Sequence, residues 1–287
     1  VAIDLKNRKR TVLFDDARSD VLGVQYHPKT HAVQAVTFER AEPLYKFADK
    51  QVEADYAVLQ KLGEGRIEVE SASRDDKRWV VSQSPTDGPT RYYRYDRDTQ
   101  KASLLFVDRP ALLEKKLAKR RPLLIKSRDG LELVSYLSLP VDSDAGSNRA
   151  PKAPLPLVLK VHGGPWARDH YGYDANHAWL ASRGYAVLSV NYRGSTGFGK
   201  KVVNAGDRQW AGKMHDDLID AVAWAVREGI ADKERIAIMG GSYGGYATLV
   251  GLTFTPDTFA CGVDVVGPSN LETLLGSVPP YWKPFLE

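Results

Sequence analysis

Residues 235–246 read Arg235-Ile-Ala-Ile-Met-Gly-Gly-Ser-Tyr-Gly-Gly-Tyr246, and a helical run from Ala247 to Phe254 follows them. The apolar run that ends at Met239 is typical of a buried parallel strand, and it passes into glycines and a helix without a polar connector. Ser242 stands at this junction in the pattern Gly-x-Ser-x-Gly, the nucleophile elbow, where a strained turn exposes a serine hydroxyl. The sequence therefore predicts that Ser242 is a catalytic nucleophile. The alternative is a glycine-rich turn that only joins a strand to a helix.

Around this stretch, short apolar runs alternate with helical segments. The expected strands are Leu131–Leu139, Leu157–Val161, Ala186–Val190, Arg235–Met239 and Cys261–Val266. The expected helices run from Asp174 to Gly184, from about His215 to Glu228, and directly behind Ser242. Such alternation predicts an α/β fold, in which helices cover both faces of a mostly parallel sheet.

Residues 1–110 are predicted to be β structure with an internal repeat. Ile3–Phe14 aligns with Tyr95–Phe106 at a fixed offset of 92 residues. Half of this offset is the length of one four-stranded propeller blade, roughly 40 to 50 residues. We therefore expect about two blades of a β-propeller, whereas the alternative is a small β-sandwich with an accidental similarity. Because propellers close with about four to eight blades, the sequence predicts that this chain was cut from a larger protein.

Composition excludes several classes of protein. The net charge of +4 is mild for 287 residues, and no basic stripe alternates with aromatic residues, so no nucleic-acid partner is expected. No apolar run reaches the roughly 18 residues of a membrane span. The single cysteine, Cys261, can form no intrachain disulfide and is expected to pack in the core. The basic cluster at 115–121 is interpreted as a solvated face or hinge.

Two further motifs stand where a hydrolase needs them. His162-Gly-Gly-Pro165 follows the strand Leu157–Val161, in the loop that supplies one half of an oxyanion hole. The other half is the N–H of the residue after the nucleophile. Asn191–Gly199 is a glycine-rich turn after the next strand, and the sequence leaves open whether it contacts substrate or is a tight solvent loop.

The three motifs, His162-Gly-Gly-Pro165, Asn191–Gly197 and Gly240–Gly245, with a propeller upstream, resemble the prolyl oligopeptidase family of serine peptidases. The resemblance is nearest to the acylaminoacyl-peptidase branch, because other branches carry a tyrosine near the Gly164 position. It implies an α/β-hydrolase catalytic domain over residues 111–287, preceded by the last blades of a seven-bladed propeller in residues 1–110. It also implies Ser242 as nucleophile and the N–H groups of Tyr243 and Gly164 as oxyanion donors. No cofactor or metal is implied.

The chain departs from this family in one respect: the acid and the base of the triad are absent. α/β-hydrolases run in the order Ser, Asp or Glu, and then His, yet all six histidines precede Ser242. Asp257 and Asp264 come too early to be the acid. We therefore expect that the chain is truncated before the acid and base and is inactive alone. His162 is interpreted as structural, and two other histidines are rejected as substitute bases, His170 and His177.

The expected activity is hydrolysis of short aminoacyl or acylaminoacyl peptides through an acyl-enzyme on Ser242. A carboxylesterase of the same fold and a propeller interaction scaffold with a degenerate hydrolase domain remain alternatives. In the acylaminoacyl branch the segment after Leu271 supplies apolar walls for the side chain before the scissile bond. Trp282 and Phe285 are therefore assigned to that pocket, although packing on the core would also explain them. Oligomeric state, including a homo-oligomer, and compartment stay open, with a weak preference for the cytoplasm.

Overall fold

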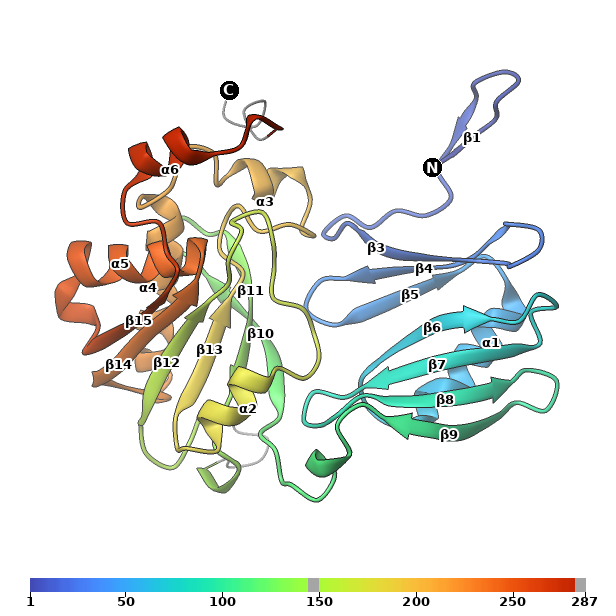
Figure 1. Ribbon diagram of the computed structural model, residues 1–287, viewed down its shortest axis with the longest axis horizontal. Helices are drawn as coiled ribbons and strands as arrows, with labels where there is room; N and C mark the ends of the chain where they lie inside the picture. The colour runs from blue at the N-terminus through green and yellow to red at the C-terminus, as the bar shows by residue number, and fades with distance from the viewer. Residues whose placement is uncertain (144–149, 282–287) are drawn as a thin grey trace.

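The computed structural model describes residues 1–143 and 150–281, which form two parts that lie side by side (Figure 1). The first part contains β1 (Ala2–Ile3), β2 (Arg10–Thr11), β3 (Val21–Tyr26), β4 (Val33–Glu39), β5 (Pro43–Phe47), α1 (Lys50–Leu59), β6 (Arg66–Ala72), β7 (Arg78–Ser84), β8 (Arg91–Asp96) and β9 (Lys101–Val107). The second contains β10 (Arg120–Lys126), β11 (Glu132–Ser138), β12 (Leu155–Val161), α2 (Ala175–Ala181), β13 (Ala186–Val190), α3 (Lys200–Asn204), α4 (Lys213–Arg227), β14 (Ala231–Gly241), α5 (Tyr243–Phe254), β15 (Cys261–Val265) and α6 (Leu271–Ser277).

The second part is built on one mixed sheet with the strand order β10-β11-β13-β12-β14-β15. The β10/β11 and β11/β13 pairs are antiparallel, and the β13/β12, β12/β14 and β14/β15 pairs are parallel. This confirms the predicted α/β-hydrolase fold class with a mostly parallel sheet. The carboxyl ends of β12 and β14 are neighbours, since Val161 is in register with Gly240. The strand order therefore brings the His162 motif and the elbow together.

Alternating residues of the central strands face two helical layers. Leu157 and Leu159 of β12 belong to the main core, together with Leu218 and Ala221 of α4 and Ala247 of α5. Val158, which points the other way, packs with residues of β13 and α2. This period of two is the physical reason that the apolar runs fold as strands buried on both faces.

The predicted repeat is visible as two hairpins with the same backbone. Ile3 pairs with Arg10 in β1/β2, and Tyr95 pairs with Ala102 in β8/β9, so the register is identical at the offset of 92 residues. The turns also match, because Arg8 and Gln100 both have positive φ, at 58° and 51°. After the first hairpin comes a three-stranded sheet, β3-β4-β5, and then a four-stranded sheet, β6-β7-β8-β9, which includes the second hairpin. They are antiparallel, as a propeller requires.

Helix α1 interrupts residues 1–110, which were predicted from the sequence to be β structure. Asp49 caps the helix by accepting hydrogen bonds from the N–H groups of Gln51 and Val52. Val52, Tyr56 and Leu59 are spaced as one helical face and are buried in the core of this part, against residues of β4, β6 and β7. The acidic cap followed by this spacing was a helix signal that the expectation missed.

Two other expectations were wrong at single residues. The basic cluster at 115–121 does expose Lys115 and Lys116, but it does not expose Arg120. Arg120 is not solvated but buried, because its guanidinium lies 4.3 Å over the Tyr136 ring and donates to the His170 carbonyl at 2.6 Å. Cys261 is exposed rather than packed. It lies on β15, which is the last strand of the sheet order, so the apolar character of the run did not ensure burial of each side chain.

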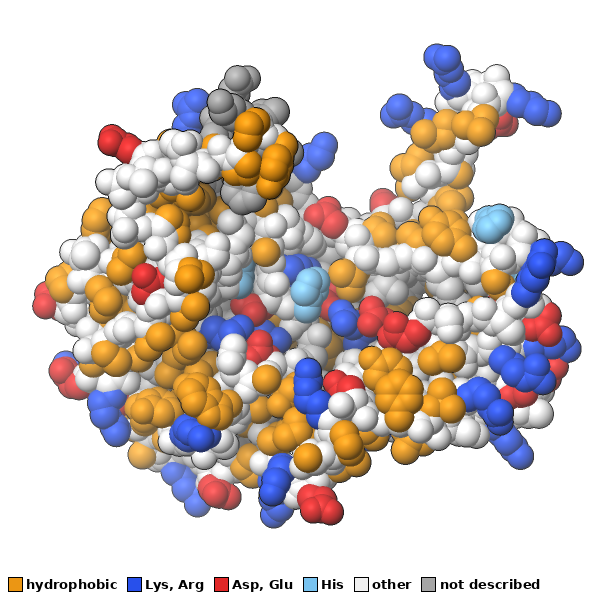
Figure 2. All heavy atoms as spheres, viewed as in Figure 1, with side chains coloured by type: hydrophobic (Ala, Val, Ile, Leu, Met, Phe, Trp, Pro, Cys, Tyr) orange, Lys and Arg blue, Asp and Glu red, His pale blue; other side chains and the backbone are white. Residues whose placement is uncertain are grey.

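Where the two parts meet, Figure 2 shows charged side chains of both signs gathered near the middle of the face, below a hollow beside the projecting N-terminal hairpin. Arg168 of the second part donates to the backbone carbonyls of Glu39 and Arg40, at 2.8 and 2.7 Å. The two parts are therefore joined by specific polar contacts as well as by chain connectivity.

His177 of α2 is a buried neutral group in this fold. Its Nδ1 and Nε2 lie 3.0 Å from Ser138 Oγ and 2.7 Å from Ser189 Oγ. Burial, with a further contribution from the charge of Arg120, lowers the pKa of His177 to about 3. The folded protein therefore keeps this ring neutral at pH values where the unfolded chain binds a proton.

We expect the free energy of unfolding to fall as the pH drops from about 6.5 towards 3, by up to about 1.4 kcal/mol per pH unit from this residue. Urea denaturation at pH 7 and pH 5 measures it. His177→Gln should reduce the difference between the two pH values, whereas His31→Asn, at an exposed histidine, should keep it. An unchanged pH dependence in His177→Gln would contradict the assignment.

Candidate active site

Ser242 lies between β14 and α5 with φ 56° and ψ −119°, a conformation that non-glycine residues rarely adopt. Its N–H donates to the Val265 carbonyl at 2.9 Å, which ties the turn to β15. The residue is exposed, and its hydroxyl has no hydrogen-bond partner among residues 1–143 and 150–281. The strain thus holds an accessible and unengaged hydroxyl at the carboxyl edge of the sheet.

The glycines around Ser242 are required by close backbone approach. A Cβ atom on Gly244 would lie 2.2 Å from the Val161 carbonyl oxygen, and one on Gly240 would lie 2.4 Å from the Gly244 backbone. A Cβ on Gly245 would lie 2.2 Å from Asp264 Oδ1 and 2.7 Å from Gly267 Cα. The first turn of α5 is therefore pressed against β12 and against the segment after β15.

The loop 162–165 lies directly against the elbow. A Cβ on Gly163 would be 3.0 Å from the Gly241 carbonyl oxygen and 3.4 Å from Ser242 Cβ. Gly164 is exposed with φ 127°, and its N–H has no acceptor in the part of the chain that the structure describes. Tyr243 begins α5, where backbone N–H groups have no intrahelical acceptor. Two backbone donors are thus available beside Ser242.

Ser242, Tyr243 and Gly164 line one cavity of about 580 Å³. Its other described walls carry no charged side chain and are formed by Trp166, Trp210, Val266, Pro268, Leu271, Leu274, Leu275 and Val278. Val266 has φ 51°, which is unusual for a β-branched residue and marks a second strained position at this cavity. The wall includes α6, in the segment expected to form an apolar pocket. Trp282 and Phe285 lie outside the described residues.

The Tyr243 side chain is packed in the core beside this cavity. It is buried, it makes an edge contact with Trp210 at 4.7 Å, and its hydroxyl lies 3.7 Å from Met214 Sδ. Burial raises the pKa of Tyr243. The phenol is therefore a neutral packing group.

No histidine ring makes a hydrogen bond to Ser242 within the described ranges. His162 lies 2.7 Å from the Gly163 carbonyl through Nδ1 and 3.0 Å from Ser195 Oγ through Nε2, and it stacks on Tyr192. Burial lowers the pKa of His162, so a neutral ring braces the loop. This geometry agrees with the structural role predicted for His162. Two further histidines form hydrogen bonds elsewhere. His170 pairs with the Glu39 carboxylate, and His177 lies between the Ser138 and Ser189 hydroxyls.

Comparison with known proteins matches residues 171–281 to the model of the prolyl oligopeptidase family. The chain belongs to this family. Dipeptidyl aminopeptidase BIII of Pseudoxanthomonas mexicana is 56% identical over 286 residues, which are 100% of this chain and 42% of that protein. Acylamino-acid-releasing enzyme 1 of Oryza sativa subsp. japonica is 31% identical over 131 residues, 45% of this chain and 17% of that enzyme.

Among solved structures, a Mycobacterium tuberculosis puromycin-hydrolyzing peptidase matches with a TM-score of 0.67 and 26% identity, over 88% of this chain and 38% of that one. The chain thus spans about two fifths of the length of the dipeptidyl aminopeptidase and of the puromycin-hydrolyzing peptidase. No helix in residues 1–143 and 150–281 has the length and apolar character of a membrane span, and these residues contain no cluster that could hold a metal ion.

The family's glycine-rich turn Asn191–Gly199 is not the tight solvent loop that was one alternative. Its first five residues are buried, and two of their side chains serve the fold. Asn191 accepts from the Asp169 N–H at 2.8 Å, and Arg193 binds Asp217 at 2.7 Å. These bonds occupy both side chains, while a contact between this turn and substrate stays a prediction.

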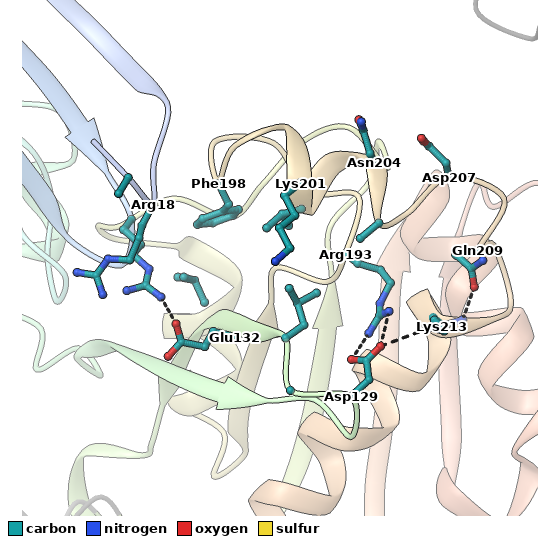
Figure 3. Close-up of a pocket in the computed structure, with 17 residues that line it drawn as sticks. Arg18, Asp129, Glu132, Arg193, Phe198, Lys201, Asn204, Asp207, Gln209 and Lys213 are labelled. Carbon is teal, nitrogen blue, oxygen red and sulfur yellow. Dashed lines mark hydrogen bonds and ion pairs between the residues drawn. The ribbon is translucent and has the colours of Figure 1, made fainter. Parts of the chain in front are cut away.

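A larger cavity of about 750 Å³ lies beside this turn. Among the described residues, no serine, threonine or cysteine lines it. Figure 3 shows Arg193 and Lys213 directed at Asp129, with Arg18 at the left of the view and Lys201 between Arg18 and Arg193. Both guanidinium nitrogens of Arg193 donate to Asp129 at 2.9 Å. Asp129 thus pairs with Arg193 and Lys213, and Glu132 pairs with Arg40, so that carboxylates and basic groups in this cavity bind each other. The smaller apolar cavity at Ser242 is therefore the candidate active site.

The elbow geometry makes a direct prediction about glycine. We expect Gly244→Ala to lower the free energy of unfolding by about 3 kcal/mol or more, because its Cβ would meet only backbone atoms, which cannot move aside. Urea denaturation measures the change. Gly241→Ala is the matched control, since its Cβ would be 3.7 Å from the nearest atom, the Val265 carbonyl oxygen. Equal stability of the two variants would contradict the close approach.

Proposed function

We propose that this protein is a serine peptidase that hydrolyses short peptides through an acyl-enzyme on Ser242. Membership of the prolyl oligopeptidase family supports the proposal. The names of two relatives, a dipeptidyl aminopeptidase and an acylamino-acid-releasing enzyme, favour substrates cleaved near their N-terminus. Because the chain spans only part of these relatives, the proposal concerns the full-length protein.

One observation carries the proposal: a strained, exposed serine shares a cavity with two free backbone donors. Ser242 has φ 56°, and Gly164 and Tyr243 line the same wall. This conformation costs about 1–3 kcal/mol, and a turn that only joins a strand to a helix would not need it.

In the proposed reaction, Ser242 Oγ attacks the scissile carbonyl carbon while a base accepts the hydroxyl proton. The carbonyl oxygen becomes an oxyanion that accepts hydrogen bonds from the Gly164 and Tyr243 N–H groups. Collapse of this intermediate releases the amine, which takes up the proton, and leaves the acyl-enzyme. Water then attacks the ester in the same way. No imidazole within the described residues reaches Ser242, so the base and its acid are assigned to residues outside them.

The apolar cavity is proposed to hold the side chain that precedes the scissile bond. Its described walls are uncharged, and a hydrophobic wall gains free energy by removing an apolar side chain from water. Trp282 and Phe285 are proposed as further walls, on the resemblance to the acylaminoacyl branch. The proposed substrates are thus short peptides with an apolar residue before the cleaved bond.

The direct test is Ser242→Ala in the full-length protein, assayed with aminoacyl and dipeptidyl nitroanilides. We expect kcat to fall by about six orders of magnitude, as it does when a triad serine is removed. Mass spectrometry of the protein after a fluorophosphonate should place the label on Ser242. The 287-residue chain alone should show almost no turnover, because the base is missing. Hydrolysis that survives in Ser242→Ala, or robust hydrolysis by this chain alone, would overturn the assignment.

The oxyanion assignment has a separate test in Tyr243→Phe. Only the backbone N–H of this residue is proposed to act, and its hydroxyl faces Met214 Sδ. We therefore expect kcat to change by less than about tenfold, far below the 10²–10³ loss typical for removal of an oxyanion donor. A loss in that larger range would show that the hydroxyl takes part.

A further inference from the structure

A fully buried carboxylate stands where the two parts of the molecule meet. The Glu39 side chain, at the end of β4, has no exposed surface. Its Oε1 accepts from the Tyr171 N–H at 3.1 Å and lies 2.9 Å from His170 Nδ1 and 3.2 Å from Arg168 Nη2. Burial alone would raise the pKa of Glu39, but the hydrogen bond from His170 and the charge of Arg168 outweigh it and hold the pKa below its ordinary value. The carboxylate is therefore ionised and bound mainly by the segment 168–171.

Arg168 completes this junction from the other side. Its guanidinium donates to the backbone carbonyls of Glu39 and Arg40 and also faces the Glu39 carboxylate. One side chain therefore binds three acceptor groups at the end of β4. Only 5% of the side chain is exposed. A planar, multidentate donor of this kind fixes direction as well as distance, which the single ammonium of a lysine cannot do.

Arg168 lies four residues after Gly164, and the connection between them is tight. A Cβ on Gly164 would be 2.7 Å from the Trp166 N and 3.0 Å from the Ala167 N, so the chain folds back on itself at this point. The Ala167 carbonyl accepts from the Thr196 N–H at 3.0 Å. A displacement of Arg168 would therefore be passed through a closely packed turn to the Gly164 amide.

The neighbouring glycine-rich turn is anchored at Asp20, directly before β3, which pairs with β4 in the same sheet. The Asp20 N–H donates to the Gly197 carbonyl at 3.0 Å, and the Gly199 N–H donates to Asp20 Oδ2 at 3.1 Å. Arg168 lies 4.2 Å over the Phe198 ring, and a Cβ on Gly197 would meet its Nη1 at 2.5 Å. The first part of the molecule thus holds both segments that flank the candidate active site, the loop that leads to Arg168 and the turn Asn191–Gly199.

We propose that Glu39 and Arg168 are positioning residues for the loop 162–165, which carries the proposed oxyanion donor. Strand β4 of the first part would then set the position of the Gly164 N–H. This inference rests on the proposed function of Ser242 and Gly164, and deepens it. Neither side chain lines the cavity at Ser242, so neither touches substrate there. Their effect would be on the transition state, because an oxyanion donor that is misplaced by about 1 Å can cost on the order of 100-fold in rate.

The test uses Arg168→Lys in the full-length protein. We expect kcat to fall on the order of 10- to 100-fold, while KM changes by less than about threefold. A peptide aldehyde separates positioning from general damage, because Ser242 Oγ adds to its carbonyl carbon and its oxygen then occupies the oxyanion position. Its inhibition constant should rise by about the same factor as kcat falls. Glu39→Gln gives a second measurement, with a loss in kcat in the same direction.

Arg66→Lys is the matched control. Arg66 faces the same carboxylate from β6, at 3.5 Å, but within the described residues it makes no hydrogen bond or ion pair with the segment 162–171. It should keep kcat within about threefold. Equal losses in Arg66→Lys and Arg168→Lys, an unchanged kcat in Arg168→Lys, or a lower kcat without weaker aldehyde binding would overturn the positioning role. If the unsubstituted protein showed no Ser242-dependent turnover, the proposed function itself would fail, which is a distinct result.

Discussion

The approach of α5 to β12 is the constraint on which the rest of the site depends. Helix and strand meet backbone to backbone at Gly244 and Val161, a contact that leaves no room for a Cβ atom. This contact places Ser242 at the sheet edge in its strained conformation, and brings the loop after β12 to within van der Waals distance of it. Burial of the alternating strand residues holds the sheet in place, but the absence of side chains at the elbow decides where Ser242 stands.

Polar and apolar functions are separated in space around this point. The cavity at Ser242 has uncharged walls in the described part of the chain. The ion pairs Arg168–Glu39 and Arg193–Asp129 lie outside that cavity. Arg193 is held by Asp129 and Asp217, and Arg168 is held by Glu39, so the guanidinium groups order loops instead of facing the nucleophile. A dry wall beside backbone donors strengthens the hydrogen bonds that an oxyanion would receive, since a low dielectric increases electrostatic interactions.

Much of this arrangement could be predicted from local sequence. The apolar runs, the elbow around Ser242 and the repeat between Ile3–Phe14 and Tyr95–Phe106 are local patterns, and each was found. The cap at Asp49 was also local but was overlooked. The burial of Arg120 and Glu39 could not be read in this way, because it depends on partners far along the chain, such as Arg168 for Glu39 at a separation of 129 positions. The exposure of Cys261 likewise depends on the place of β15 in the sheet order. A charged residue gives the same signal in sequence whether it is solvated or enclosed by an ion pair.

The elbow also has a consequence for how such a protein can change over time. Its architecture is specified by the glycines, while the hydroxyl of Ser242 makes no bond within the described fold. Chemistry and folding are therefore encoded by different residues of the same short motif. A lineage can lose the serine hydroxyl and keep a stable protein, whereas loss of a neighbouring glycine removes both together. Non-catalytic descendants of this fold are thus expected to retain the glycines long after the nucleophile has gone.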